Sequence, residues 1–220
     1  MKIYFTCLIL TGILFLSACA NEEQEEIHAV ALKEVENIHI DHGSTTLKVE
    51  SADIESVEVG LLYNNNGSGI VINEGKQYIK IRLKGDIRRL LNIGKMPELL
   101  IRIPASYTGN ITIDGSSGNV NIKNLNEQKL DIKGSSGNVA LEYAHINNDI
   151  HVSVKSGNVL LKLNDKNSNA YWLLKSGSGR RSVAIPLENI QRSNRKTEGQ
   201  TGDGSVKVQI HTTSGNITIK

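Results

Sequence analysis

Cysteine is nearly absent from this sequence, and neither copy can contribute to a disulfide framework. The chain of 220 residues has two cysteines, Cys7 and Cys19, and both lie in its N-terminal segment. A folded domain without disulfides must be held together by its own core. A chain of about 200 residues buries roughly 70% of its unfolded surface, which is enough for one domain.

Aromatic residues and net charge are also scarce. Both phenylalanines, Phe5 and Phe15, lie in the N-terminal segment, so a core must consist of Ile, Leu and Val with Trp172 and a few Tyr. The 25 basic and 23 acidic residues nearly balance, so global charge directs the chain toward neither nucleic acid nor a polyanion. We expect no nucleic-acid partner, because aromatic residues are not interleaved with the basic ones.

The N-terminal apolar run is shorter than a membrane span. It follows Lys2 and extends from Ile3 to Leu16, whereas a span needs about 20 residues. A charged start, an apolar middle and a small-residue end predict a secretory signal peptide over residues 1–18. An ordinary signal peptide followed by an incidental cysteine is the alternative.

The end of this segment, Leu16-Ser17-Ala18-Cys19, resembles the lipid-attachment site of bacterial lipoproteins. The resemblance implies that the Cys19 thiol takes a diacylglyceryl group and that signal peptidase II cuts before it. Two acyl chains give stable membrane attachment. We therefore expect a protein anchored by lipid at the extracytoplasmic face of the cell membrane.

The residues after Cys19 are too polar to bury. The stretch 21–26 is almost all Glu and Gln, which is typical of a solvated tether. Near Glu36 the sequence changes to the alternation of a half-buried strand. We assign residues 19–35 to the lipidated cysteine and a polar tether, and residues 36–220 to one domain.

A four-residue motif recurs in the C-terminal half. It consists of Ser-Gly-Asn followed by Val or Ile, and its copies begin at Ser117, Ser136, Ser156 and Ser214. The first three copies are 19 and 20 residues apart, and the fourth follows after 58, close to three periods. A weaker copy at residues 176–179 indicates one of the intervening turns. A further unit, with Thr-Thr in place of Gly-Asn, occupies residues 38–49.

Apolar residues keep one register around every copy. They stand six and four residues before the serine and three and five residues after it, as Leu130, Ile132, Val139 and Leu141 do around Ser136. Each unit is thus a strand, a tight turn and a strand, which must stack on its neighbours to bury its apolar face. The sequence predicts an all-β fold, a single-stranded parallel β-helix or β-solenoid with coils of 19–20 residues. In the alternative, the motif is a hairpin turn in an antiparallel β-sandwich.

The two central turn residues have separate expected roles. Glycine accepts positive φ without steric cost, and asparagine is the next most tolerant residue. Asparagines stacked about 4.8 Å apart can also form a hydrogen-bonded ladder. We assign these structural roles to Gly118, Asn119, Gly137, Asn138, Gly157, Asn158, Gly215 and Asn216.

Outside the regular repeat, the pattern is still mostly that of strands. Apolar alternation predicts strands at 57–59, 70–72, 78–83 and 99–103, the last ended by Pro104. Leu90-Leu91 is the one candidate for a helical turn or loop, and the stretch 188–203 is interpreted as an inserted loop.

These features together resemble the putative-adhesin, toast-rack-like β-helix domains of bacterial surface proteins. The strand 99–104, the glycine turn at Gly109 and the Gly-Ser-Ser-Gly-Asn-Val units at Gly115 and Gly134 carry the resemblance. It covers roughly residues 36–220. It implies a repetitive surface domain linked to adhesion or envelope stress, with no agreed catalytic residues.

Residues that could perform chemistry do not form a recognisable site. His39, Asp41 and His42 are the only tight cluster of potential metal ligands, and of these His39 and Asp41 are expected on the outward side of their strand. Zinc would need a third and usually a fourth ligand of fixed geometry, and none is nearby in sequence. No histidine partners a serine and an acid in readable order. The sequence therefore assigns no catalytic residue, no metal site and no cofactor.

One local excess of positive charge remains, between residues 175 and 200. Within it Arg180, Arg181, Arg192 and Arg195 are candidates for binding a polyanion. A plain solvated loop explains the same charges.

The sequence favours a non-enzymatic, lipid-anchored envelope protein, a monomer whose rigid solenoid binds a cell-wall polymer or an envelope protein. The alternative is a polysaccharide-acting β-helix enzyme. Such an enzyme would need acids and bases grouped on one face, whereas the outward positions Thr112, Asp131, His151 and Tyr171 are chemically unrelated.

Overall fold

Strands make up all the regular secondary structure in the residues that the computed structural model describes, which are 23–64, 69–84, 97–165 and 168–220. None of these residues lies in a helix long and apolar enough to cross a membrane. The strands are β1 (Glu23–Ala31), β2 (Asn37–Gly43), β3 (Thr46–Ala52), β4 (Ser56–Asn64), β5 (Ile70–Glu74), β6 (Tyr78–Leu83), β7 (Glu98–Pro104), β8 (Asn110–Gly115), β9 (Val120–Lys123), β10 (Lys129–Ser136), β11 (Val139–Tyr143), β12 (Asp149–Ser156), β13 (Val159–Leu163), β14 (Ala170–Ser178), β15 (Arg181–Val183), β16 (Glu188–Arg192), β17 (Lys196–Thr201), β18 (Val206–Ser214) and β19 (Ile217–Ile219).

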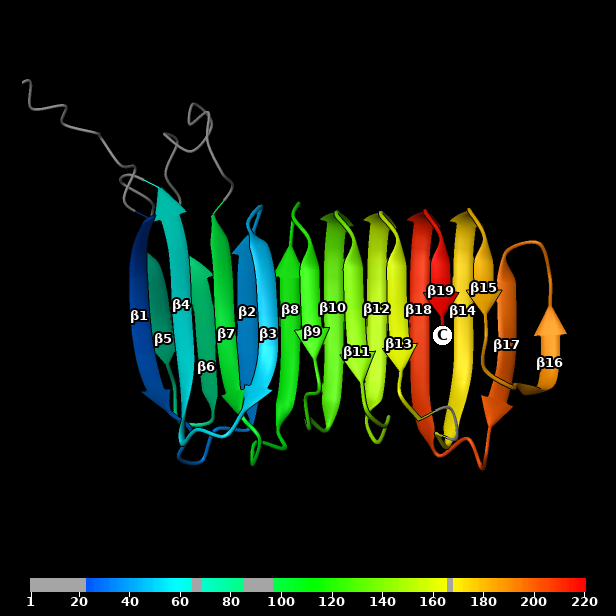
Figure 1. Ribbon diagram of the computed structural model, residues 1–220, viewed down its shortest axis with the longest axis horizontal. Helices are drawn as coiled ribbons and strands as arrows, with labels where there is room; N and C mark the ends of the chain where they lie inside the picture. Colours follow the sequence, from blue (N-terminus) through cyan, green and yellow to red (C-terminus); the bar gives the residue numbers. More distant parts are fainter. Residues whose placement is uncertain (1–22, 65–68, 85–96, 166–167) are drawn as a thin grey trace, which may run out of the picture.

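The strands form two large sheets along the long axis of the molecule (Figure 1). Sheet A has nine strands in the order β1-β4-β7-β3-β9-β11-β13-β19-β15. Sheet B has ten strands in the order β16-β17-β14-β18-β12-β10-β8-β2-β6-β5. The predicted strands 57–59, 70–72, 78–83 and 99–103 correspond to β4, β5, β6 and β7. The helical turn expected at Leu90-Leu91 lies outside the described residues.

Each repeat unit places its two strands in different sheets. β10 and β11 flank one Ser-Gly-Asn turn, yet β10 belongs to sheet B and β11 to sheet A. Each pairs in parallel with the equivalent strands of the neighbouring units, so Leu130 lies beside both Ile111 and Ile150. The motif is therefore the corner of a β-solenoid coil and does not join a hairpin.

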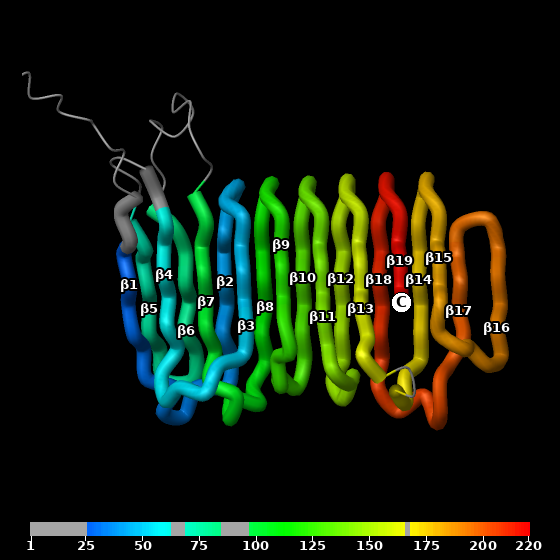
Figure 2. Tube along the Cα trace, in the orientation of Figure 1, coloured from blue at the N-terminus to red at the C-terminus, as the bar shows by residue number. Residues whose placement is uncertain are grey.

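The last coil in the sequence is not the last coil of the stack. β18 and β19 insert between the coil of β12 and β13 and the coil of β14 and β15 (Figure 2). Ser214 pairs with Ser156 on one side and with Ser178 on the other. The turn near residue 176, expected between the third and fourth motifs, instead lies beyond the fourth. Parallel pairing needs only matching strand patterns, and Ile210 matches both Val152 and Leu174.

Part of the predicted tether at the N-terminal end is instead a strand with an antiparallel partner. β1 pairs with β4 along its whole length, so the fold begins at Glu23, well before Glu36. Among residues 26–31 only Val30 is buried, and Ile27 is 61% exposed. Main-chain hydrogen bonds hold this edge strand, and edge strands tolerate charged side chains. The sequence of β1 therefore lacks the alternation of apolar and polar residues from which a strand is predicted.

The prediction of an inserted loop near the C-terminal end is wrong. Residues 188–203 contain β16 and β17, which form an antiparallel hairpin beside β14. The inward residues of β17 are Thr197, Gly199 and Thr201, too polar to suggest a strand. The indole Nε1 of Trp172 donates a hydrogen bond to Thr201 Oγ1 at 3.0 Å, which joins this hairpin to the core.

One hydrophobic core runs between the two sheets. It consists almost entirely of Ile, Leu and Val, as the scarcity of aromatic residues predicted. Trp172 and Tyr143 are its largest buried side chains. The inward faces of most strands contribute to this core, so the outward faces of sheets A and B are left to present polar side chains.

Candidate binding surface

The turn glycines form a column in which each backbone touches the next. Gly137 has φ of +106°, and a Cβ on it would lie 2.0 Å from the carbonyl oxygen of Gly118. Such a position excludes every other residue, both for conformation and for space. Equivalent positive φ values occur at Gly118, Gly157, Gly215 and Gly179.

The turn asparagines form a ladder that runs through the stack. Each Oδ1 accepts a hydrogen bond from the backbone N–H of the equivalent residue in the next coil, at 2.8–3.0 Å. The order is Asn119, Asn138, Asn158 and Asn216, and the final donor is the N–H of Arg180. The bonds run mainly from backbone to side chain, with one bond between side chains, at 3.2 Å, from Asn158 to Asn138. These asparagines thus have a structural role, because they join neighbouring coils.

The expected lipid-attachment site precedes the part of the chain that the structure describes. Cys19, the whole of the expected signal peptide and the first residues of the expected tether lie outside the described residues. Chain connectivity nevertheless places Cys19 four residues before Glu23, the first residue of β1.

Arg181, one of the four predicted polyanion contacts, is engaged within the protein. Its Nε donates to Thr197 Oγ1 at 3.2 Å, and Nη2 donates to the carbonyl oxygens of Ser193 and Asn194 at 3.0 and 3.1 Å. The guanidinium group therefore holds the turn between β16 and β17. It is a half-buried structural residue, which corrects its expected role in a binding loop.

The other three arginines, Arg180, Arg192 and Arg195, are exposed. The carbonyl oxygen of Arg195 accepts the N–H of Ser176, which places the β16–β17 turn beside the corner of the β14 coil. These three residues form the arginine end of the molecule.

The predicted cluster of His39, Asp41 and His42 is split between two faces of β2. The His42 ring is buried, with Nδ1 2.6 Å from the carbonyl oxygen of Thr45, and burial lowers its pKa. His39 and Asp41 point outward, as expected for alternate strand positions. In the described residues, no group of three or more His, Cys, Asp or Glu side chains could hold a metal ion.

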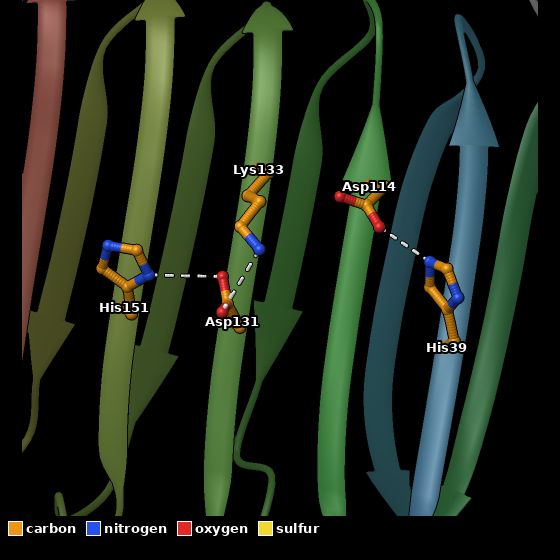
Figure 3. A network of polar contacts seen from close by, with 5 residues as sticks. All are labelled: His39, Asp114, Asp131, Lys133 and His151. Atoms are coloured by element: carbon orange, nitrogen blue, oxygen red, sulfur yellow. Dashed lines mark hydrogen bonds and ion pairs between the residues drawn. The ribbon is translucent and has the colours of Figure 1, made fainter. Parts of the chain in front are cut away.

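The outward face of sheet B carries two histidine–aspartate pairs (Figure 3). His39 Nε2 lies 2.7 Å from Asp114 Oδ2, and His151 Nδ1 lies 3.3 Å from Asp131 Oδ1. Lys133 Nζ lies 3.6 Å from the other oxygen of Asp131. The outward positions Asp131 and His151, interpreted from sequence as unrelated, are therefore direct partners. Stacking of the coils, not proximity in sequence, brings each pair together.

Three shallow depressions adjoin one another on this face, and His151 lines all of them. Their volumes are about 240, 290 and 510 Å³. The first lies over Lys129 and Lys207, the second over Leu173 and Lys175, and the third extends to Asp114. They are open, and this shape suits an extended ligand lying across strands better than a small molecule enclosed in a pocket.

A buried carboxyl group stabilises the opposite corner of the coils. Glu127 Oε1 accepts hydrogen bonds from the Tyr143 hydroxyl at 2.6 Å and from Asn148 Nδ2 at 2.8 Å. Its Oε2 is buried without a hydrogen-bond partner among the described residues. Burial raises the pKa of Glu127, because water no longer solvates the charged form. The acidic residue was not predicted, since nothing in its sequence neighbourhood indicates burial.

Comparison with known proteins identifies the repeat region. The family described as Toastrack DUF4097 matches residues 111–220. No curated protein matches the chain. The fold is similar to that of a putative cell adhesion protein from Clostridium sporogenes ATCC 15579, with 17% identity, a TM-score of 0.69, and coverage of 90% of this chain and 99% of that one.

A second solved structure, a putative adhesin from Bacteroides fragilis NCTC 9343, has 13% identity and a TM-score of 0.38, with 91% of this chain and 99% of that one covered. At these identities the Clostridium structure supports the fold alone.

Proposed function

Because this chain belongs to the Toastrack DUF4097 family, we propose that it is a lipid-anchored, non-enzymatic cell-envelope protein. Its rigid β-solenoid, with coils of 19–20 residues between successive Ser-Gly-Asn corners, is presented outside the membrane for adhesion, binding or an envelope-stress-related interaction. The partner is a cell-wall polymer or an envelope protein, and the protein acts as a monomer. The similarity to a solved structure named a putative cell adhesion protein supports this proposal.

The short connection between Cys19 and β1 supports display close to the membrane. Glu23 is the fourth residue after Cys19, and four steps of extended chain span at most about 14 Å. A lipid on Cys19 would hold the N-terminal end of the stack near the bilayer. The coils would then carry the outward faces away from the anchor as one rigid body.

The observation that carries a binding function is the broad outward face of sheet B. Backbone ladders fix its strands about 4.8 Å apart, so its polar side chains form regular rows. The backbone beneath these rows is already ordered when a partner binds, which lowers the entropic cost of association. Two surfaces are candidates for the contact, this outward face and the arginine end.

Cell fractionation with the Cys19→Ala variant tests the anchoring. The native chain is expected in the membrane fraction with incorporated labelled fatty acid, and the variant is expected as uncleaved precursor or as released protein without label. Label that persists in the variant would refute lipidation at Cys19. Cross-linking in intact envelopes, with Cys19 retained, then tests whether the displayed domain contacts wall polymer or protein.

The enzyme alternative is favoured by one observation, the pairing of His151 with Asp131 beside an open groove. A histidine–aspartate pair on a polysaccharide-binding face can act in proton transfer. We expect no release of new reducing ends from wall or capsule polymers by the purified protein. Measurable turnover that disappears in Asp131→Asn would establish the enzyme in place of the binding protein.

A further inference from the structure

Positive charge is concentrated on one part of sheet B. The outward side chains of β10, β12, β18 and β14 include five lysines and two aspartates. We call this surface the lysine face; its lysines are Lys129, Lys133, Lys155, Lys175 and Lys207. On the neighbouring outward surface of β8, β2 and β6, Lys80 and Arg82 balance Asp41 and Asp114.

Most of these lysines form no ion pair within the described residues. Lys133 lies near Asp131, but in the described part of the chain the other four make no ion pair with a carboxylate. All four are exposed. Asp149 lies opposite Lys129 and accepts the backbone N–H of Lys207, and Glu198 lies close enough to Lys175 to interact with its charge. These carboxylates offset the lysines only in part, so an anion bound among the lysines would reduce the repulsion that remains.

The outward face of sheet A shows the opposite arrangement. Glu50, Lys123, Glu142 and Lys162 occupy paired positions on successive strands, so the sign of the charge alternates along the row. Opposite charges directly across strands stabilise a sheet. The same solenoid thus neutralises its charges on one face and leaves a positive excess on the other.

The lysines lie on both sides of a central strip of the lysine face. Lys129 and Lys207 lie toward one end of their strands, with Lys155 and Lys175 toward the other. Along the strands, Lys175 lies four residues, about 13 Å, and Lys155 six residues, about 20 Å, from the row of Lys129 and Lys207. Between them lie His151, Gln209 and Leu173 in one row across β12, β18 and β14. The same row ends in a carboxylate on each side, Asp131 on β10 and Glu198 on β17. Two of the depressions that share His151 adjoin this row, and the third extends away from it toward Asp114.

From this arrangement we infer that the lysine face binds an extended anionic glycan, a linear polysaccharide bearing carboxylate or phosphate groups. The polymer lies along the solenoid axis, with its anionic groups near the lysines on both sides. Its hydroxyl groups contact the imidazole and amide groups of the strip, and the apolar side of a sugar ring packs on Leu173. This inference rests on the proposed function and specifies the contact surface and the ligand class.

Direct binding measurements on the full chain, purified from cells, test this assignment. The probes are polygalacturonate, a carboxylated polysaccharide, and long-chain polyphosphate, with neutral dextran as the control polymer. Replacing Lys129, Lys155, Lys175 and Lys207 with Gln should weaken binding of the anionic probe on the order of tenfold at low salt. It should also reduce the salt dependence of binding. The two anionic probes distinguish carboxylate from phosphate as the recognised group.

A matched variant on the opposite face separates a site from bulk charge. Lys48, Lys123, Lys162 and Lys220 are exposed outward residues of sheet A or its C-terminal end, and their change to Gln alters net charge equally. This variant should bind nearly as tightly as the native chain. Equal weakening in both variants would overturn the inference, and so would full binding by the lysine-face variant.

Two further arms complete the test. Loss of binding only when Arg180, Arg192 and Arg195 are changed to Gln would move the contact to the arginine end. A His151→Ala variant, which keeps every lysine, is expected to weaken polygalacturonate binding with unchanged melting temperature.

A native chain that binds neither anionic polymer yet cross-links in envelopes would refute this ligand class and leave the proposed function standing. Absence of any envelope contact would refute the proposed function itself.

Discussion

The column of turn glycines allows a quantitative test of what holds the coils in register. We consider Gly137→Ala, with Gly43→Ala as its matched control. Gly43 also has positive φ, +56°, but a Cβ on it meets nothing within 4 Å. At Gly137 a Cβ would lie 2.0 Å from the carbonyl oxygen of Gly118. The pair therefore separates backbone strain from the close approach of neighbouring coils.

The expected magnitudes differ for that reason. An alanine at the left-handed conformation of Gly43 costs about 1–2 kcal/mol of folding free energy. At Gly137 the conformational cost is about 1–3 kcal/mol, and displacement of the neighbouring coil adds about 1–3 kcal/mol more. For a domain of this size each kcal/mol lowers the melting temperature by about 2–4 °C. Gly137→Ala should thus melt at least about 4 °C below the native protein.

Denaturant unfolding of the chain with Cys19→Ala, monitored by circular dichroism and by Trp172 fluorescence, provides the measurement. We expect the unfolding free energy of Gly137→Ala to fall below that of Gly43→Ala by about 1–3 kcal/mol. Equal stabilities of the two variants would show that the coils move apart at negligible cost. The argument from close packing of the corners would then be wrong.

Three other predictions concern buried groups and the order of the coils. The raised pKa of Glu127 means that its contribution to stability is present at low pH and lost as pH rises through the folded-state pKa. The unfolding free energy of Glu127→Gln, measured by urea unfolding relative to that of the native chain, should therefore increase from pH 4 to pH 8. A difference between the two proteins that does not change with pH would contradict this. Arg181→Ala should cost about 1–3 kcal/mol through lost hydrogen bonds, whereas the exposed Arg195→Ala should stay within about 0.5 kcal/mol in thermal melts; equal effects would argue against the bracing role of Arg181. Deleting residues 206–220 removes the coil beside Trp172 and should shift its fluorescence to the red; an unchanged spectrum would mean that β14 re-stacks directly on β12.

Local features of the sequence determined the corner and the strands of each regular coil. A glycine with positive φ and alternating apolar residues act within a few positions of one another, so Gly137 and its flanking strands could be predicted without any neighbour. The Ile, Leu and Val core followed in the same way. The edge strand β1 and the hairpin of β16 and β17 could not be predicted, because main-chain pairing stabilises them and their side chains bury little apolar surface.

The order of the coils and the candidate surface depended on tertiary structure. Equivalent coils have almost the same inward pattern, so sequence could not reveal that β18 pairs with β12 ahead of β14. Each His–Asp contact and the lysine face join residues from different coils, and His39 and Asp114 are 75 residues apart. The physical reason is that parallel stacking places side chains from distant segments about 4.8 Å apart, and only the stacking order decides which ones become neighbours.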